Sequence, residues 1–330
     1  MRRLARRIRR WFRPRGGPAI LMYHRIATPE VDPWGLAVSP ERFAEQVEAL
    51  HAHRTTLSMD SFVARLQSGD LPHDAVALTL DDGYSDNLLQ AKPILEAVGV
   101  SATVFLATGL IGSGEEFWWD ELARMVLLRA EPLATTLTVE TDCLQIELPP
   151  IGPQEPRMDW RGWERPVTAR EQAYQAIWQA LWLRTPENRK AAIEQLRQIF
   201  GPARSNRQDL PMAVADVRKL VSDWVSVGAH GRFHQPLISL PAAARLEDMQ
   251  KSREEAEELS GLPVTGFAYP HGACNPETVD MASRAGYRWA CATNENAIDQ
   301  KRVSLHSLPR LAVGDWSGQT LLANLRAIRV

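Results

Sequence analysis

The stretch at residues 74–83, DAVALTLDDG, decides the fold. Its apolar run is typical of a buried strand, and two aspartates and a glycine follow it directly. Further apolar runs, which we also interpret as strands, lie at residues 19–23, 101–107, 224–229, 263–269, 287–292 and near 308–313. Strands that alternate with helical segments over short connections predict parallel β/α units.

Helical patterns separate these runs. They begin at Pro40 and also cover residues 86–98, 213–222, 242–259 and 276–285. The sequence therefore predicts an α/β fold with about seven strands in a closed or nearly closed (β/α) barrel. A barrel fits better than an open sheet because its chemistry would lie at the carboxyl ends of the strands. Polar or turn-forming residues stand at four such ends: His24, the pair Asp81 and Asp82, His230, and Pro270.

The alternation of strands and helices is interrupted at residues 112–212, which predicts an insertion between barrel elements. Residues 135–148 alternate like a hairpin, and residues 168–183 and 186–200 have helical patterns. Seven of the eleven tryptophans lie within residues 112–224. These indoles either stack on sugar rings near a site or pack the insertion against the barrel. Trp118 and Trp119 are the pair that tests this choice first.

Charge is concentrated at the N-terminus. The chain has a net charge of −2, yet residues 1–15 hold eight arginines and no acid. We therefore separate a basic segment, residues 1–18, from a barrel that covers residues 19–330. If residues 1–13 are helical, their apolar side chains share one face, and the segment either lies on anionic lipid or remains a solvated tail. Nucleic-acid binding is not expected, because the basic residues form one short tail without a stacking motif.

Cysteine spacing and hydropathy bear on the compartment. Cys143, Cys274 and Cys291 show neither metal nor disulfide spacing, and a low, odd count suits a reducing environment. The sequence contains no apolar stretch of about 18 residues that would span a membrane, and no apolar segment follows the basic start as in a secretion signal. We expect a cytoplasmic protein, either free or peripheral at the inner face of the membrane.

The aspartate pair and two spaced histidines are the parts of a metal site. His230 and His234 would share one face if their segment turns helically. One carboxylate and two imidazoles suffice for a divalent metal with an open position, and a second carboxylate could act as a base. Helix capping would explain one aspartate more readily than two. Residues 267–272, FAYPHG, end another strand as an ordinary turn or as a groove wall whose backbone N–H stabilises an oxyanion.

These motifs resemble those of the polysaccharide deacetylase family, carbohydrate esterase family 4, also called the NodB-homology domain. The stretch LTLDDG at residues 78–83 is similar to the family's TFDDG motif. HGRFH at residues 230–234 is similar to H(S/T)xxH, and AYPHG at residues 268–272 occupies the place of RxPxG. The resemblance covers roughly residues 19–111 and 213–315 and implies a distorted (β/α)7 barrel with the hairpin-plus-helices segment inserted.

Three departures from the family pattern stand out. Gly231 replaces a hydroxyl residue, and Ala268 replaces the arginine that pairs with the catalytic aspartate, a charge that Arg310 could supply. The late Leu-x-His motif, which carries the general acid, is not found in order, although His306 is near its place. The circularly permuted branch of the family has an early Tyr-His, to which Tyr23-His24 is similar. The resemblance therefore favours His24 as the acid over His306.

The resemblance also implies an activity. It implies Zn²⁺, with Co²⁺ or Ni²⁺ as alternatives, held by Asp82, His230 and His234, and Asp81 as the general base. The substrate would be an N-acetylated, or otherwise N-acylated, amino sugar of a polysaccharide, glycan or lipid-linked precursor. The residues expected to contact it are Trp119, Tyr269, Pro270, His271 and Gly272, with the Tyr269 N–H holding the oxyanion. The alternative is a catalytically silent barrel that binds glycan at the membrane surface.

Overall fold

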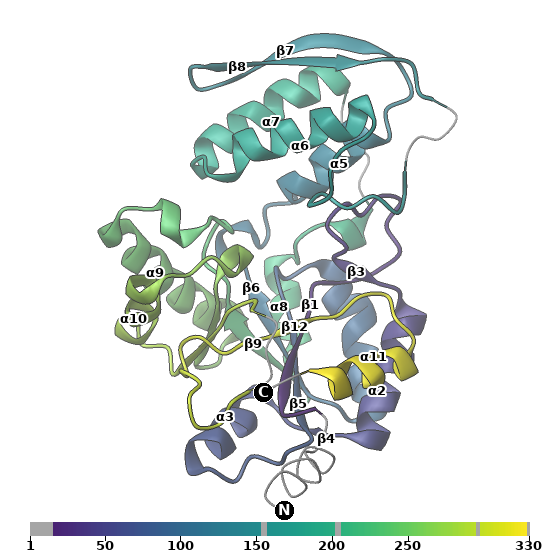
Figure 1. Cartoon of the computed structure of the whole chain (residues 1–330). Helices are drawn as coiled ribbons and strands as arrows, with labels where there is room; N and C mark the ends of the chain where they lie inside the picture. The colour runs from purple at the N-terminus through teal and green to yellow at the C-terminus, as the bar shows by residue number, and fades with distance from the viewer. Residues whose placement is uncertain (1–15, 153–156, 202–205, 295–297, 329–330) are drawn as a thin grey trace, which may run out of the picture.

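Eight parallel strands form one curled sheet, and seven of them follow one another around it. The computed structural model describes residues 16–152, 157–201, 206–294 and 298–328 (Figure 1). In spatial order the strands are β11 (Trp289–Cys291), β10 (Gly266–Ala268), β9 (Val225–Ala229), β6 (Ala102–Leu106), β5 (Ala75–Leu80), β1 (Ala19–Tyr23) and β12 (Leu311–Ala312). The short β4 (Thr55–Thr56) pairs with the start of β5.

The two edges of the sheet approach each other just before β12. The Leu308 N–H donates to the Ala290 carbonyl at 2.9 Å, and the Ala292 N–H donates to the Leu308 carbonyl at 2.8 Å. The segment that leads into β12 therefore also pairs with β11, and the sheet curls into a nearly closed barrel. The predicted α/β fold, a distorted barrel of seven strands, is confirmed.

Burial explains why the central strands read as unbroken apolar runs. Every residue of β1, β5 and β6 is buried, because the barrel interior covers one face and helices cover the other. Thr79 in β5 is polar, and its buried hydroxyl donates to the Leu21 carbonyl at 2.8 Å. The carboxyl ends of these strands consequently present their polar residues at one rim of the barrel.

Helices surround the sheet (Figure 1). They are α2 (Pro40–His53), α3 (Met59–Ser68), α4 (Lys92–Val98, after a π-turn at Asn87–Ala91), α8 (Val214–Leu220), α9 (Ala242–Ser260), α10 (Pro276–Arg284) and α11 (Gly318–Ala327). The sequence analysis did not identify α3 or α11. Both begin with a serine side chain that caps the helix, Ser58 and Ser317, so a local signal was present.

The segment at residues 112–212, here called the insertion, packs around an apolar cluster of its own (Figure 1). Its elements are α5 (Trp118–Leu127), β7 (Leu133–Val139), β8 (Asp142–Leu148), α6 (Ala169–Trp182) and α7 (Pro186–Phe200). The hairpin β7–β8 lies on α6 and α7. The predicted hairpin and the two long helices are present, whereas α5 was not expected.

Candidate active site

Asp81 and Asp82 stand where β5 ends and the chain turns sharply. The Asp81 N–H still continues the ladder and donates to the Tyr23 carbonyl at 2.9 Å. Asp82 and Gly83 then adopt left-handed conformations, with φ of 73° and 82°. A β-carbon at Gly83 would lie 2.8 Å from the Leu106 side chain, so glycine is required there. This turn sends the two carboxylates in different directions.

Asp82, His230 and His234 meet at the rim of the barrel. Each offers one ligand atom, and these atoms lie within 4.8 Å of one another. The Asp82 Oδ1 atom is 3.5 Å from His230 Nε2 and 3.3 Å from His234 Nε2. The expected helical turn between the histidines is wrong. Positive φ angles at Gly231 (67°) and His234 (49°) form a tight loop that brings both rings to the carboxylate.

These three side chains fit a divalent metal ion. All are buried, and Asp82 Oδ1 has no hydrogen-bond partner among the described residues. Burial and the neighbouring Asp81 raise the pKa of Asp82 well above its usual range, a cost that a cation would remove. His230 donates through Nδ1 to the Ala268 carbonyl at 2.8 Å, so its Nε2 lone pair faces Asp82. Burial lowers the pKa of both imidazoles and keeps them neutral, as ligands must be.

Asp81 lies beside the triad in a buried ion pair with Arg310. Two guanidinium nitrogens donate to its two carboxylate oxygens, both at 2.7 Å. Burial alone would raise the pKa of Asp81, but Arg310 and the nearby imidazoles lower it to about 2. Arg310, which enters from the segment before β12, therefore supplies the positive charge missing at Ala268. The Arg310 Nε–H also donates to the Ala292 carbonyl at 3.0 Å.

The structure brings His24, and not His306, to this site. His24 Nε2 lies 4.0 Å from Asp81 Oδ2, and burial lowers the His24 pKa to about 4. His306 Nε2 instead lies 2.9 Å from the Tyr287 carbonyl, and His306 is not among the described residues that line the pocket. Asn87 fixes the backbone at His24 by donating to its carbonyl at 2.9 Å.

A pocket opens over the metal triad between the barrel and the insertion. Its described lining includes His24, Asp81, Asp82, His230, His234, Tyr269, His271, Gly272 and Thr293 from the barrel. The opposite wall consists of Trp34 and Leu36 from the loop after β2 (Arg25–Ile26), together with Trp119, Trp178 and Trp182 from the insertion.

The 267–272 turn lies at the pocket as expected, but Tyr269 and Pro270 do not take the roles predicted for them. The Tyr269 N–H donates to the Cys291 carbonyl at 3.1 Å, so it is not free to hold an oxyanion. Pro270 is buried and is not among the described residues that line the pocket, which corrects its assignment to substrate contact. His271, with a positive φ of 57°, packs its ring 4.3 Å from the ring of His234.

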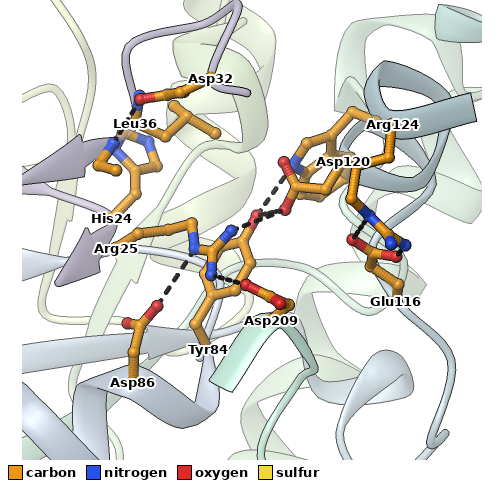
Figure 2. A network of polar contacts seen from close by, with 12 residues as sticks. His24, Arg25, Asp32, Leu36, Tyr84, Asp86, Glu116, Asp120, Arg124 and Asp209 are labelled. Carbon is orange, nitrogen blue, oxygen red and sulfur yellow. Dashed lines mark hydrogen bonds and ion pairs between the residues drawn. The ribbon is translucent and has the colours of Figure 1, made fainter. Parts of the chain in front are cut away.

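Arg25 is a buried hub that the sequence analysis missed (Figure 2). Its guanidinium pairs with Asp209 at 2.6 Å, Asp86 at 3.1 Å and Asp120 at 3.7 Å. It also lies over the Tyr84 ring, 4.7 Å from the centroid. No local pattern identifies these partners, because they come from three separate parts of the chain. Asp120 and Asp209 lie near the two ends of the insertion, so Arg25 fastens both ends to the strand that follows His24.

The hub continues to the metal triad through two further hydrogen bonds. The Tyr84 hydroxyl donates to Asp120 at 2.6 Å, and Trp119 Nε1 donates to the Tyr84 hydroxyl at 2.9 Å. The Trp119 ring then packs 4.7 Å from the ring of His234. Trp119 is almost fully buried, so it supports the triad more than it offers a stacking face.

Comparison with known proteins gives one family model whose match covers the three motifs at residues 78–83, 230–234 and 268–272. The family model described as polysaccharide deacetylase matches residues 68–128 and 197–290. YxkH of Bacillus subtilis (strain 168), provisionally named a polysaccharide deacetylase, is 29% identical over 108 residues, which are 32% of this chain and 37% of that protein. The match thus spans just over a third of that relative's length.

Solved structures share the fold at low identity. The Streptococcus pyogenes deacetylase PplD in complex with acetate aligns with a TM-score of 0.56 and 19% identity over 94% of this chain and 98% of its own. IcaB from Ammonifex degensii aligns with a TM-score of 0.57 and 17% identity over the same shares, 94% and 98%. At these identities the likeness concerns the fold alone.

Proposed function

We propose that this chain is a member of the polysaccharide deacetylase family and a metal-dependent hydrolase that removes an N-acetyl group from an amino sugar. One observation carries the proposal: the buried Asp82–His230–His234 triad stands beside a second carboxylate, Asp81, that is held ionised by Arg310. A metal site with an adjacent carboxylate base supplies the two groups that metal-assisted amide hydrolysis uses. Whether the chain belongs to the permuted branch stays a prediction.

The metal would be held by Asp82, His230 and His234. When bound, it supplies a Lewis acid that polarises the amide carbonyl and acidifies a water molecule. Asp81 takes the proton from the attacking water, and Arg310 keeps this carboxylate oriented and ionised. His24, 4.0 Å from Asp81 and neutral because burial lowers its pKa, passes to the departing nitrogen the proton that Asp81 took from the water. The C–N bond breaks, and acetate and the free amine leave.

Metal loading followed by an acetate assay tests this proposal. The purified protein is stripped, titrated with Zn²⁺, Co²⁺ and Ni²⁺, and assayed for acetate release from N-acetylated sugars, free and lipid-linked. We expect one tight metal equivalent and metal-dependent acetate release. His234→Ala should lose both, while His51→Ala, an exposed histidine, serves as the matched control. Glycan binding without acetate release at any metal would favour the silent barrel instead.

Membrane docking is a separate proposal. Residues 1–13, which would make the contact, lie outside the described residues. Among the described helices, none combines the length and apolarity needed to cross a bilayer. Eight arginines within residues 1–15 support an attraction to anionic lipid. Co-sedimentation with anionic vesicles, with and without residues 1–15, at low and high salt, would detect or dismiss it.

A further inference from the structure

The loop at residues 230–234, here called the triad loop, carries two of the three side chains of the metal triad. The barrel holds its first half through the backbone. The Thr108 N–H donates to the Gly231 carbonyl at 3.1 Å, and the Gly109 N–H donates to the Arg232 carbonyl at 2.8 Å. Both donors follow β6, the strand beside β9 in the sheet. Neither bond reaches the last two residues of the loop.

The insertion holds the second half of the triad loop through one side chain. Arg189, on α7, donates from Nη2 to the Phe233 carbonyl at 3.1 Å. This carbonyl belongs to the planar peptide group that joins Phe233 to His234, so the bond restrains the rotation of that group. His234 has a positive φ of 49°, a conformation that costs a non-glycine residue free energy and needs support from its surroundings. Arg189 supplies such support at the residue before it.

The Arg189 guanidinium is a buried charge. Arg189 is 3% exposed, and its Nη1 atom has no hydrogen-bond partner among the described residues. Burial lowers the pKa of Arg189 to about 10, so the guanidinium stays charged at neutral pH. Burying a charge in this way costs free energy that an apolar side chain of similar length would avoid. Stability alone therefore does not explain an arginine at this position.

The same guanidinium supports the triad from a second direction. It lies over the Trp118 ring, 5.7 Å from the centroid. The Trp118 ring stands edge-on to Trp119, with centroids 5.8 Å apart, and Trp119 packs against the ring of His234. The insertion therefore supports His234 both through its backbone and through its ring, and Arg189 takes part in both contacts.

We propose that Arg189 is a positioning residue of the metal site: by holding the Phe233 carbonyl, it keeps His234 oriented as a ligand. The metal affinity of the barrel would then depend on the insertion. This inference rests on the metal site of the proposed function. A positive charge near the triad repels a divalent cation, so loss of the charge alone would tighten metal binding. Loss of a hydrogen bond that orients a ligand weakens metal binding instead, typically about 10–100-fold.

Calorimetric titration of the metal-free protein with Zn²⁺ distinguishes these two effects by their sign. We expect Arg189→Met, which has an apolar chain and no donor, to raise the Kd about tenfold or more. Arg189→Lys, which keeps the charge and a donor, should recover most of the affinity. Lys190→Met is the matched control, because Lys190 is the next residue on α7 and pairs with Glu115 at 2.8 Å. The visible absorption spectrum of the Co²⁺-loaded protein should change in Arg189→Met and stay unchanged in Lys190→Met.

Hydrogen exchange of the wild type gives a test that needs no variant. Because coupling between two sites is reciprocal, Zn²⁺ should slow the exchange of amides in α7. The exchange of α11, which packs on α2 away from the insertion, should not change. Exchange in α7 that is unaffected by Zn²⁺ overturns the inference, including the case in which Arg189→Met does not fold.

The titration also separates this inference from the proposed function. A Kd for Arg189→Met that equals or falls below the wild-type Kd overturns the inference, and so does an equal rise in Lys190→Met. Zn²⁺ binding that weakens in Arg189→Met alone supports the inference even if the wild type releases no acetate. A wild type that binds no Zn²⁺ overturns both.

Discussion

The two walls of the pocket carry different kinds of side chain. The barrel wall carries charges and imidazoles, and its catalytic carboxylate is paired within the wall, Asp81 with Arg310. The insertion wall carries indole rings. A charged group needs a partner at a fixed distance, which parallel strands in register provide. Ring faces tolerate varied ligands. Under the proposed function, the barrel wall would therefore perform the reaction, and the insertion wall would shape the space that the substrate enters.

Removing the base from the barrel wall should have the largest effect. Asp81→Asn keeps the shape of the side chain but cannot take a proton, so we expect turnover to fall by roughly 10²–10⁴-fold. Metal affinity should persist, because Asp82, His230 and His234 are unchanged. Acetate release and calorimetric metal titration measure the two quantities. Activity like that of the wild type would refute the role given to Asp81.

The general acid should show the next largest effect. His24→Ala should lose about 10²-fold or more in turnover, because the departing nitrogen would leave unprotonated. His306→Ala should retain activity, since its ring contacts the Tyr287 carbonyl instead of the pocket. Both variants are compared under identical metal loading. The reverse pattern, with His306→Ala inactive and His24→Ala active, would assign the acid to His306.

The polar contacts around Arg25, which connect the insertion to the barrel, should make the stability of the protein depend on pH. Burial raises the pKa of Asp120 to about 6, above its usual 3.8, despite Arg25. The contribution of Asp120 to the free energy of unfolding is therefore present at low pH and is lost as pH rises through about 6. Asp120→Asn should remove this pH dependence, which amounts to about 2–3 kcal/mol in the free energy of unfolding. Urea unfolding at pH 4, 5, 6 and 7 measures it.

An exposed carboxyl supplies the control for that experiment. Asp280→Asn, on the surface of α10, should leave the pH profile of stability unchanged. If the free energy of unfolding has the same slope between pH 4 and 6 in Asp120→Asn and in the wild type, then Asp120 does not titrate in the contacts around Arg25. The walls would then be held together mainly by apolar packing.

The outermost indole should show the smallest effect. Trp163→Ala removes an exposed ring, so stability should change by less than about 0.5 kcal/mol. A larger loss would show that the Trp163 ring contributes to packing against Trp34, whose ring centroid lies 6.2 Å away. Thermal unfolding measures the change.

Sequence reasoning identified what is local and missed what depends on register. The strand that ends at Asp81 and the two histidines follow from adjacent residues, and Arg310 was a candidate because one positive charge was missing. Tyr269 was misassigned because only the pairing with β11 reveals that its N–H is already used. Arg25 escaped notice because its acidic partners are 61, 95 and 184 positions away. Only the folded chain brings them together.

The pairing of Asp81 with Arg310 has a consequence for biosynthesis. A chain emerging from the ribosome presents Asp81 long before Arg310, and most of the insertion and the second half of the barrel come between them. Until the segment before β12 docks, this carboxylate lacks its counter-charge and burying it is unfavourable. The catalytic centre should therefore mature last, and a product truncated before residue 310 should be an inert fragment instead of a weakened enzyme.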